Sequence, residues 1–255
     1  MFTTLMRYVL KAAIRDRLVL AAFVTMIVAA SLSIFLGSAA ALEKDQFAVV
    51  FAAGSLRLAG IIALVLFVVF HVRRAFESKD IEFILSKPVG RVSCILAHSA
   101  AFSLLAILLA GLCALIVYGL SLHMVGTGHI LWALSLAVEN IIMVNVALFF
   151  ALVLRSAVGA ALIAFGLYVL ARMMGQILGI IDAQLAAGPM MQGLEYIMQL
   201  ISLVIPRLDL MGQTSWLIYG AEGSAVGWAF IAGQGAVFTA LVLSAALFDL
   251  LRRRF

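Results

Sequence analysis

The chain has 255 residues, of which 66% are hydrophobic and 11% are charged, and its mean hydropathy is +1.22. A soluble domain of this composition would lack the polar surface needed to face water, so the composition selects the membrane class. The length leaves room for about six spans of roughly 20 residues each and for no sizeable soluble domain. In such a chain a net charge of +5 says little about nucleic acid, and no nucleic-acid partner is expected. The distribution of the charge matters more, because Lys and Arg mark the cytoplasmic side.

The first element that we expect is a helix over residues 1–17, lying in the membrane interface. Its apolar residues recur at helical spacing at Phe2, Leu5, Met6, Val9 and Ala13. Its bases form a stripe on another face, at Arg7, Lys11 and Arg15. Such a helix places its bases against anionic lipid headgroups. The alternative is that these residues are only the basic flank of the first span.

Six apolar runs are long enough to cross a bilayer, and in lipid each must be a helix because unpaired backbone groups have no water to bind. They are Leu18–Leu36, Phe51–Phe70, Ile95–Leu120, Ile130–Leu154, Ala157–Ile181 and Val226–Leu250. The first is longer than the apolar core of a signal peptide, so we expect an uncleaved span. The predicted fold is an all-α polytopic membrane protein with one transmembrane domain over residues 1–255.

The basic residues set the predicted orientation. Thirteen of the 17 Lys and Arg residues fall at the N-terminus, the second-to-third connection, the fourth-to-fifth turn and the C-terminus. The opposite connections carry six acids, Glu43, Asp45, Asp182, Glu195, Asp209 and Glu222, against two bases, Lys44 and Arg207. Because bases mark the cytoplasmic side, both termini are expected to be cytoplasmic in a multi-pass protein of the inner cell membrane.

Two charged residues lie deep inside the predicted spans. Glu139 and Arg172 are each nine residues in from the outer ends of consecutive antiparallel runs, roughly 13 Å below the surface. Either charge unpaired would cost at least about 2.5 kcal/mol, so we expect an ion pair, which fixes helix register in preference to a translocation role. Asn140 and Asn145 are placed to donate between helices. Arg57 is expected to snorkel or to serve as a second partner of Glu139.

The connection between the second and third spans, residues 71–94, combines charged and apolar residues. Residues 73–85 are expected to form a helix that presents Ile84 and Leu85, and Pro88 ends it. A soluble partner that binds a helix connected at both ends to spans can displace both of those spans. The alternative is an ordinary solvated loop, which rarely keeps an apolar pair such as Ile84-Leu85.

The longest non-spanning piece is the outer segment of residues 182–225. Within it Leu194–Ile205 is mostly apolar but too short to cross, so it is expected to lie in the interface or to re-enter the membrane. Trp216 and Tyr219 follow it and are interpreted as interfacial anchors.

No pattern in the sequence favours a catalytic or metal site. His123 and His129 stand six apart in a short loop, which defines no coordination geometry, so no metal is expected. Ser99 adjoins His98, but neighbours on a helix do not face each other, so no catalytic pair is expected. The chain also lacks G-x-x-x-x-G-K-[ST], the cradle that holds nucleotide phosphates. We therefore predict that the chain itself is not an enzyme and carries no cofactor.

The stretch EFILSKPVGR, residues 82–91, resembles the segment after the second span of ABC-2 type permeases, the membrane subunits of a class of ABC transporters. The N-terminal amphipathic helix, the six-span layout and IPRLDL at residues 205–210 are also similar to this family. The chain looks most like the permeases grouped with multi-copper-enzyme maturation, such as those serving nitrous oxide reductase. The resemblance implies that residues 73–88 form a coupling helix and that residues 2–16 form an elbow helix.

The resemblance further implies the permease subunit of an exporter, driven by a separate ABC ATPase subunit that binds ATP and docks on residues 73–91. The implied coupling residues are Arg73, Glu77, Asp80, Glu82, Ile84, Leu85, Lys87, Pro88 and Arg91. Six spans would be half a transporter, which implies a homodimer or a heterodimer with a related permease. No residue selects a cargo, although the near absence of charge in the spans favours an amphipathic one.

Three other classes of function remain open from the sequence. A non-transporting membrane anchor or assembly factor would need no ATPase. An ion-coupled carrier acting alone is usually built on inverted repeats, and no internal repeat is evident. A membrane enzyme would need a serine with a histidine, paired acids or metal ligands inside the spans, and Glu139 is the only acid deep in a predicted span. An ATPase that co-purifies with the chain would distinguish the transporter from all three.

Overall fold

The computed structural model describes residues 2–39, 43–78, 90–121, 126–184, 205–222 and 226–252. Within these ranges the chain forms eight α-helices, one short 3-10 helix and no strand, so the predicted all-α fold is confirmed. The helices are α1 (Phe2–Arg15), α2 (Arg17–Ala39), α3 (Lys44–Glu77), α5 (Arg91–Leu120), α6 (Thr127–Val153), α7 (Ala157–Gln184), η2 (Leu208–Leu210), α9 (Ser215–Tyr219) and α10 (Trp228–Arg252).

Six of these helices, α2, α3, α5, α6, α7 and α10, are long and apolar enough to cross a membrane. The chain is therefore an all-α polytopic membrane protein. The largest difference from the predicted spans is α3, whose 34 residues replace the predicted run Phe51–Phe70. At 1.5 Å per residue α3 is about 50 Å long, well beyond the roughly 30 Å of a hydrocarbon core. The helix continues past both ends of the apolar run because its flanks contain neither Gly nor Pro to stop it.

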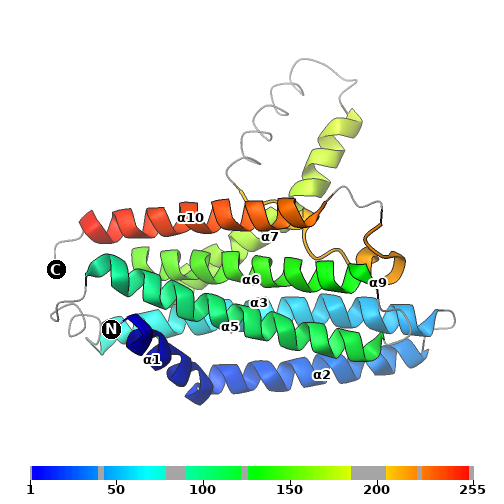
Figure 1. The fold of residues 1–255 in the computed structure, drawn as a ribbon, viewed down its shortest axis with the longest axis horizontal. Coiled ribbons are helices and arrows are strands. Elements are labelled where there is room, and N and C mark those ends of the chain that lie inside the picture. Colours follow the sequence, from blue (N-terminus) through cyan, green and yellow to red (C-terminus); the bar gives the residue numbers. More distant parts are fainter. Residues whose placement is uncertain are drawn as a thin grey trace.

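The helices form an elongated bundle in which α6 is central (Figure 1). It packs against α3, α5, α7 and α10, whereas α2 runs along α3 at one edge. The most apolar stretches of α6 and α3 are the most buried of the six, and those of α2 and α10 are the least. Of the six long helices, α3 and α6 therefore bury the largest share of their apolar stretches against protein.

The start of α1 and the end of α10 lie at the same end of the bundle (Figure 1). The last turn of α3, the first turn of α5 and the turn between α6 and α7 lie at this end too. We call it the basic end, because its described bases include Arg15, Arg73, Arg74, Arg155 and Arg252. The opposite end, with the short helix α9, is called the far end.

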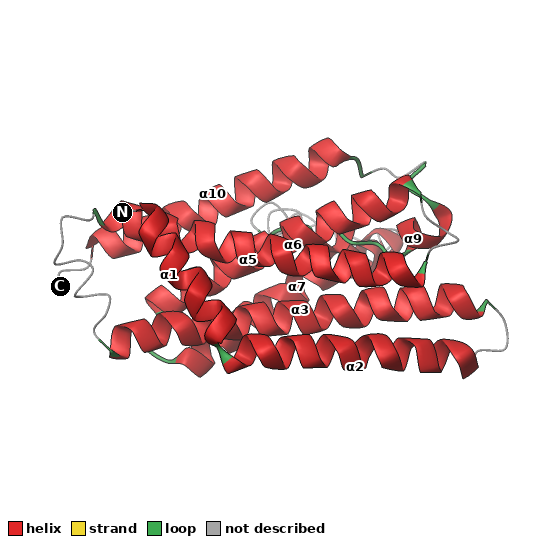
Figure 2. Ribbon diagram, turned by 60° about the horizontal axis from the view of Figure 1, so that its bottom comes forward, coloured by secondary structure: helices red, strands yellow, loops and turns green. Residues whose placement is uncertain are grey.

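Helix α1 crosses α5 near the basic end and bends into α2 at Asp16 (Figure 2). Its apolar stripe has the predicted spacing, but Val9 and Ala13 in the second half of the stripe are fully buried. The stripe therefore packs partly on protein and not only on lipid. The bend is fastened to α3, because the Arg74 guanidinium lies 3.4 Å from the Asp16 carboxylate.

Candidate functional site

Three charged residues meet in the core where α3, α6 and α7 converge. Glu139 of α6 has no exposed surface, and Arg57 of α3 is only 6% exposed. Arg57 Nε lies 3.7 Å from Glu139 Oε2, and Arg172 Nη1 of α7 lies 3.9 Å from Glu139 Oε1. Both distances exceed a hydrogen bond, so the attraction is mainly electrostatic. Two guanidiniums around one carboxylate leave this cluster with one excess positive charge.

The Arg172 guanidinium also holds a segment of backbone that we call the strap, residues 205–212. Arg172 Nη1 donates to the carbonyl oxygens of Leu208 and Met211, the latter at 2.7 Å. These carbonyls belong to the first residue of η2 and to the residue after η2, and the Leu208 carbonyl also accepts from the Met211 N–H at 3.0 Å. Arg172 adds a second hydrogen bond to the Leu208 carbonyl and one to the Met211 carbonyl, and so ties the strap to α7.

The strap fits closely over the cluster because of two glycines. Gly212 has φ of +57°, a conformation that favours glycine, and its N–H donates to Ser135 Oγ of α6 at 2.9 Å. A Cβ atom on Gly212 would overlap the Arg57 guanidinium. A Cβ atom on Gly175 of α7 would likewise overlap the Asp209 carboxylate of the strap. The strap is thus held by α3, α6 and α7 together.

The strap carries its own ion pair. Arg207 Nη2 donates to Asp209 Oδ2 at 2.9 Å and Arg207 Nε donates to Oδ1 at 3.0 Å, a bidentate arrangement. The Asp209 carboxylate that accepts these bonds raises the pKa of Arg207 above its ordinary value. This pair is neutral overall, so it does not offset the excess positive charge of the buried cluster.

The sequence placed Glu139 and Arg172 at matching depth, and the structure brings them within 3.9 Å of each other. Arg57 is a buried partner of Glu139 and does not snorkel. Sequence reasoning missed Ser135 and the strap carbonyls. The contact between Ser135 and Gly212 spans 77 residues of sequence, and no periodic pattern signals it.

Only part of the predicted coupling segment lies within the described residues. Arg73 and Glu77 belong to α3, so a separate helix beginning at Arg73 was a wrong expectation: the transmembrane helix itself continues through these residues. Arg73 Nη1 lies 3.5 Å from the Leu154 carbonyl at the end of α6. Arg91 begins α5. The other predicted coupling residues lie outside the described residues: Asp80, Glu82, Ile84, Leu85, Lys87 and Pro88.

The outer segment is described from residue 205 to 222, so most of the predicted helix Leu194–Ile205 lies outside the described residues. The interpretation of Trp216 as an interfacial anchor was wrong. Trp216 is only 3% exposed, because α9 packs on α6 so closely that the Trp216 carbonyl leaves no room for a Cβ at Gly128. Tyr219, at the end of α9, is 78% exposed.

Polar side chains join α5 to α6 by hydrogen bonds. Ser99 Oγ donates to Asn145 Oδ1 at 2.5 Å, and Asn145 Nδ2 donates to Ser103 Oγ at 3.3 Å. Asn145 therefore bonds between helices, as its position in the span predicts. His98 Nδ1 instead lies 2.9 Å from the Cys94 carbonyl of its own helix. Ser99 and His98 thus engage different partners and do not form a hydroxyl–imidazole pair.

His129 lies in the first turn of α6 and is buried, with Nε2 2.7 Å from Ser121 Oγ. His123 lies outside the described residues. Within the described ranges, no three His, Cys, Asp or Glu side chains gather closely enough to hold a metal ion. His129 is accounted for by its contact with Ser121, which closes the far end of α5 onto α6.

No family model matches this sequence, and no curated protein matches it. The class of protein is defined by the fold alone: a polytopic membrane protein with six candidate spans. Its distinguishing internal feature is a buried cluster of three charged residues, held under the strap near the convergence of three spans.

Proposed function

We propose that this chain is the membrane-spanning subunit of an ATP-binding cassette exporter, driven by a separate ATPase subunit that docks on residues 73–91. The observation that carries the proposal is how this segment is anchored. It leaves the 34-residue helix α3 at Glu77 and enters the 30-residue helix α5 at Arg91, both at the basic end. A partner bound there would act on two long helices at once.

Helix α3 connects the proposed docking segment to the buried cluster inside the membrane. Arg57 of the buried cluster lies 20 residues before Glu77 on the same helix, about 30 Å along its axis. The cluster in turn touches the strap through Arg57 and Arg172. A displacement of α3 by the ATPase would therefore disturb the contacts that hold the strap, and we propose that this opens a path toward the far side.

The orientation and assembly follow from the same proposal. The basic end faces the cytoplasm, because bases are retained on that side, and the ATPase is cytoplasmic. The ATPase is a separate chain, because this sequence has no phosphate-binding loop of the G-x-x-x-x-G-K-[ST] type. Six spans supply half of a transporter, so the chain pairs with a second copy or with a related permease.

The test is co-purification from the native host in mild detergent. The tagged chain should bring down an ATPase subunit, and changing Glu82, Ile84 and Leu85 together to alanine should remove it. A matched control changes Tyr219 and Glu222, exposed at the far end, to alanine and should retain the ATPase. If no ATPase accompanies the intact wild-type chain, or if the control loses it equally, the proposal is wrong.

The buried cluster favours a second candidate, an ion-coupled carrier, because charged residues inside a membrane frequently belong to ion pathways. The chain reconstituted alone in liposomes distinguishes the two. Accumulation of the transported compound inside the liposomes, driven by an ion gradient, abolished by an ionophore and seen with no ATPase present, would support the carrier. Transport that requires the ATPase and ATP would exclude it.

A further inference from the structure

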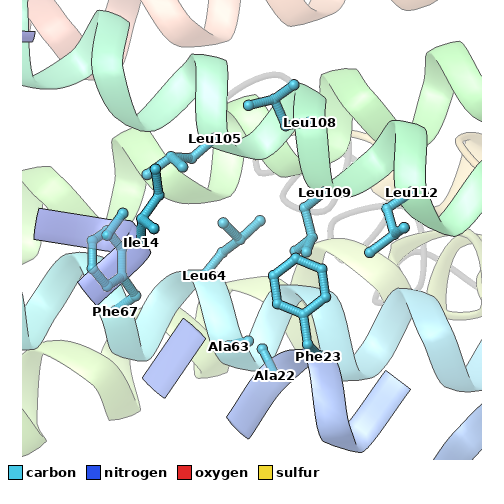
Figure 3. Close-up of a pocket in the computed structure, with 11 residues that line it drawn as sticks. Ile14, Ala22, Phe23, Ala63, Leu64, Phe67, Leu105, Leu108, Leu109 and Leu112 are labelled. Carbon is cyan, nitrogen blue, oxygen red and sulfur yellow. The ribbon is translucent and has the colours of Figure 1, made fainter. Parts of the chain in front are cut away.

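An apolar groove of about 330 Å³ lies between α1, α2, α3 and α5 (Figure 3). Every side chain that lines it is an alanine, isoleucine, leucine or phenylalanine. Leu64 of α3, Phe23 of α2 and Leu109 of α5 point toward one another across it. The groove therefore offers no polar partner to water, and its natural content is hydrocarbon.

The space exists because small residues line it where the helices approach. Ala13 comes from the last turn of α1, Ala22 from the second turn of α2 and Ala63 from α3. The groove is open along one side, where Ile14 is 80% exposed and Leu108 is also exposed. In a membrane this open side faces lipid, so the groove can be filled from the bilayer without any movement of the helices.

The mouth of the groove is positively charged. Lys11, Arg15 and Arg17 are exposed at the α1–α2 bend, and α2 begins at Arg17. Ala22 and Phe23 follow five and six residues later, so the bases lie roughly 8 to 9 Å along the helix axis from the apolar lining. The acid between them, Asp16, is turned away into its ion pair with Arg74. Exposed bases at this short distance from an apolar groove match the two parts of an anionic lipid.

We propose that this groove binds one acyl chain of an anionic phospholipid whose headgroup contacts Arg15 and Arg17. The volume is at the small end of ligand sites, which suits a single chain better than a whole two-chain lipid. The bases add attraction for a negative headgroup that a zwitterionic lipid lacks. This site does not depend on the proposed exporter function, because it needs neither an ATPase nor a cargo.

The test uses the full-length chain in detergent and native mass spectrometry. Phosphatidylglycerol and phosphatidylcholine with identical acyl chains are titrated separately, and bound lipid is counted. The wild type should retain phosphatidylglycerol more tightly. Changing Arg15 and Arg17 to glutamine should weaken phosphatidylglycerol by roughly five-fold for each base and leave phosphatidylcholine unchanged. Ala63→Leu, which fills the groove, should weaken both lipids.

Two controls match these variants. Ala21→Leu adds the same bulk one residue from Ala22 but at an exposed position outside the lining. Arg155→Gln removes an exposed base at the same end of the bundle but away from the groove. Neither should change lipid binding. Should Ala63→Leu not fold, Ile14→Asp at the exposed rim serves in its place. Equal binding of the two lipids by the wild type, or undiminished binding after either groove substitution, would overturn the proposal.

Discussion

Changing Glu139 to glutamine removes the negative charge that stands between Arg57 and Arg172. At 3.7 and 3.9 Å, and with an effective dielectric constant of about 20, each arginine attracts the carboxylate by roughly 4 kcal/mol. Part of this attraction is offset because a neutral glutamine costs less to bury. Breaking a buried ion pair by removing one partner costs about 3–5 kcal/mol. We expect this loss for Glu139→Gln, because two like charges then face each other inside the protein.

The comparison with Arg57→Gln makes the expectation specific to the cluster. That change removes a positive charge from a site with one in excess, so it leaves a neutral pair of Glu139 and Arg172. The attraction lost is partly balanced by the repulsion that disappears between the two arginines. We expect Arg57→Gln to cost less than half as much as Glu139→Gln.

The assay is thermal unfolding of the detergent-purified chain, followed by tryptophan fluorescence. Trp132 and Trp216 are both buried, so unfolding should shift their emission. At about 2–4 °C per kcal/mol for a chain of this size, Glu139→Gln should lower the Tm by roughly 6–20 °C. If Arg57→Gln lowers the Tm as much as Glu139→Gln does, the three charges do not act as one cluster and the reasoning fails.

Two further predictions concern close packing and use the same unfolding assay. Gly235→Ala should lower the free energy of unfolding by about 1–3 kcal/mol, because its Cβ would overlap Val138 of α6. Gly233→Ala is the control, because a Cβ there faces open space and should cost nothing. Equal effects of the two substitutions would contradict the packing explanation. Ser135→Ala should cost about 1–3 kcal/mol, because it leaves the buried Gly212 N–H without its acceptor. It should also speed tryptic cleavage in the strap, and an unchanged cleavage rate would argue that Ser135 does not hold the strap.

The parts of the fold that could be predicted are those set by local chemistry. Apolar runs located all six spans to within a few residues at most ends, because the membrane core imposes both their length and their helical state. The depth of Glu139 and Arg172 could be counted from the ends of their runs. The length of α3 could not be predicted from the sequence, because hydropathy falls at Lys44 and His71 although the helix includes both residues.

The parts that could not be predicted depend on contacts between distant segments. Trp216 has the composition of an interfacial anchor, and only the docking of α9 on α6 reveals that it is buried. Gly212 looks like an ordinary turn residue, and only its proximity to Arg57 explains why a side chain would not fit. A hydropathy pattern records the environment of a residue and carries no information about its partner.

None of the three prolines of the chain falls within a described helix: they are Pro88, Pro189 and Pro206. Proline is the commonest cause of a sharp helix kink, so none of the six long helices carries a proline kink within its described residues. Helix α7 nevertheless changes direction along its length (Figure 1), and the chain also turns where helices are interrupted, at Asp16 between α1 and α2 and at residues 154–156 between α6 and α7. Substitutions at these bends and interruptions should alter the motion of the protein more than substitutions in the straight parts of the helices.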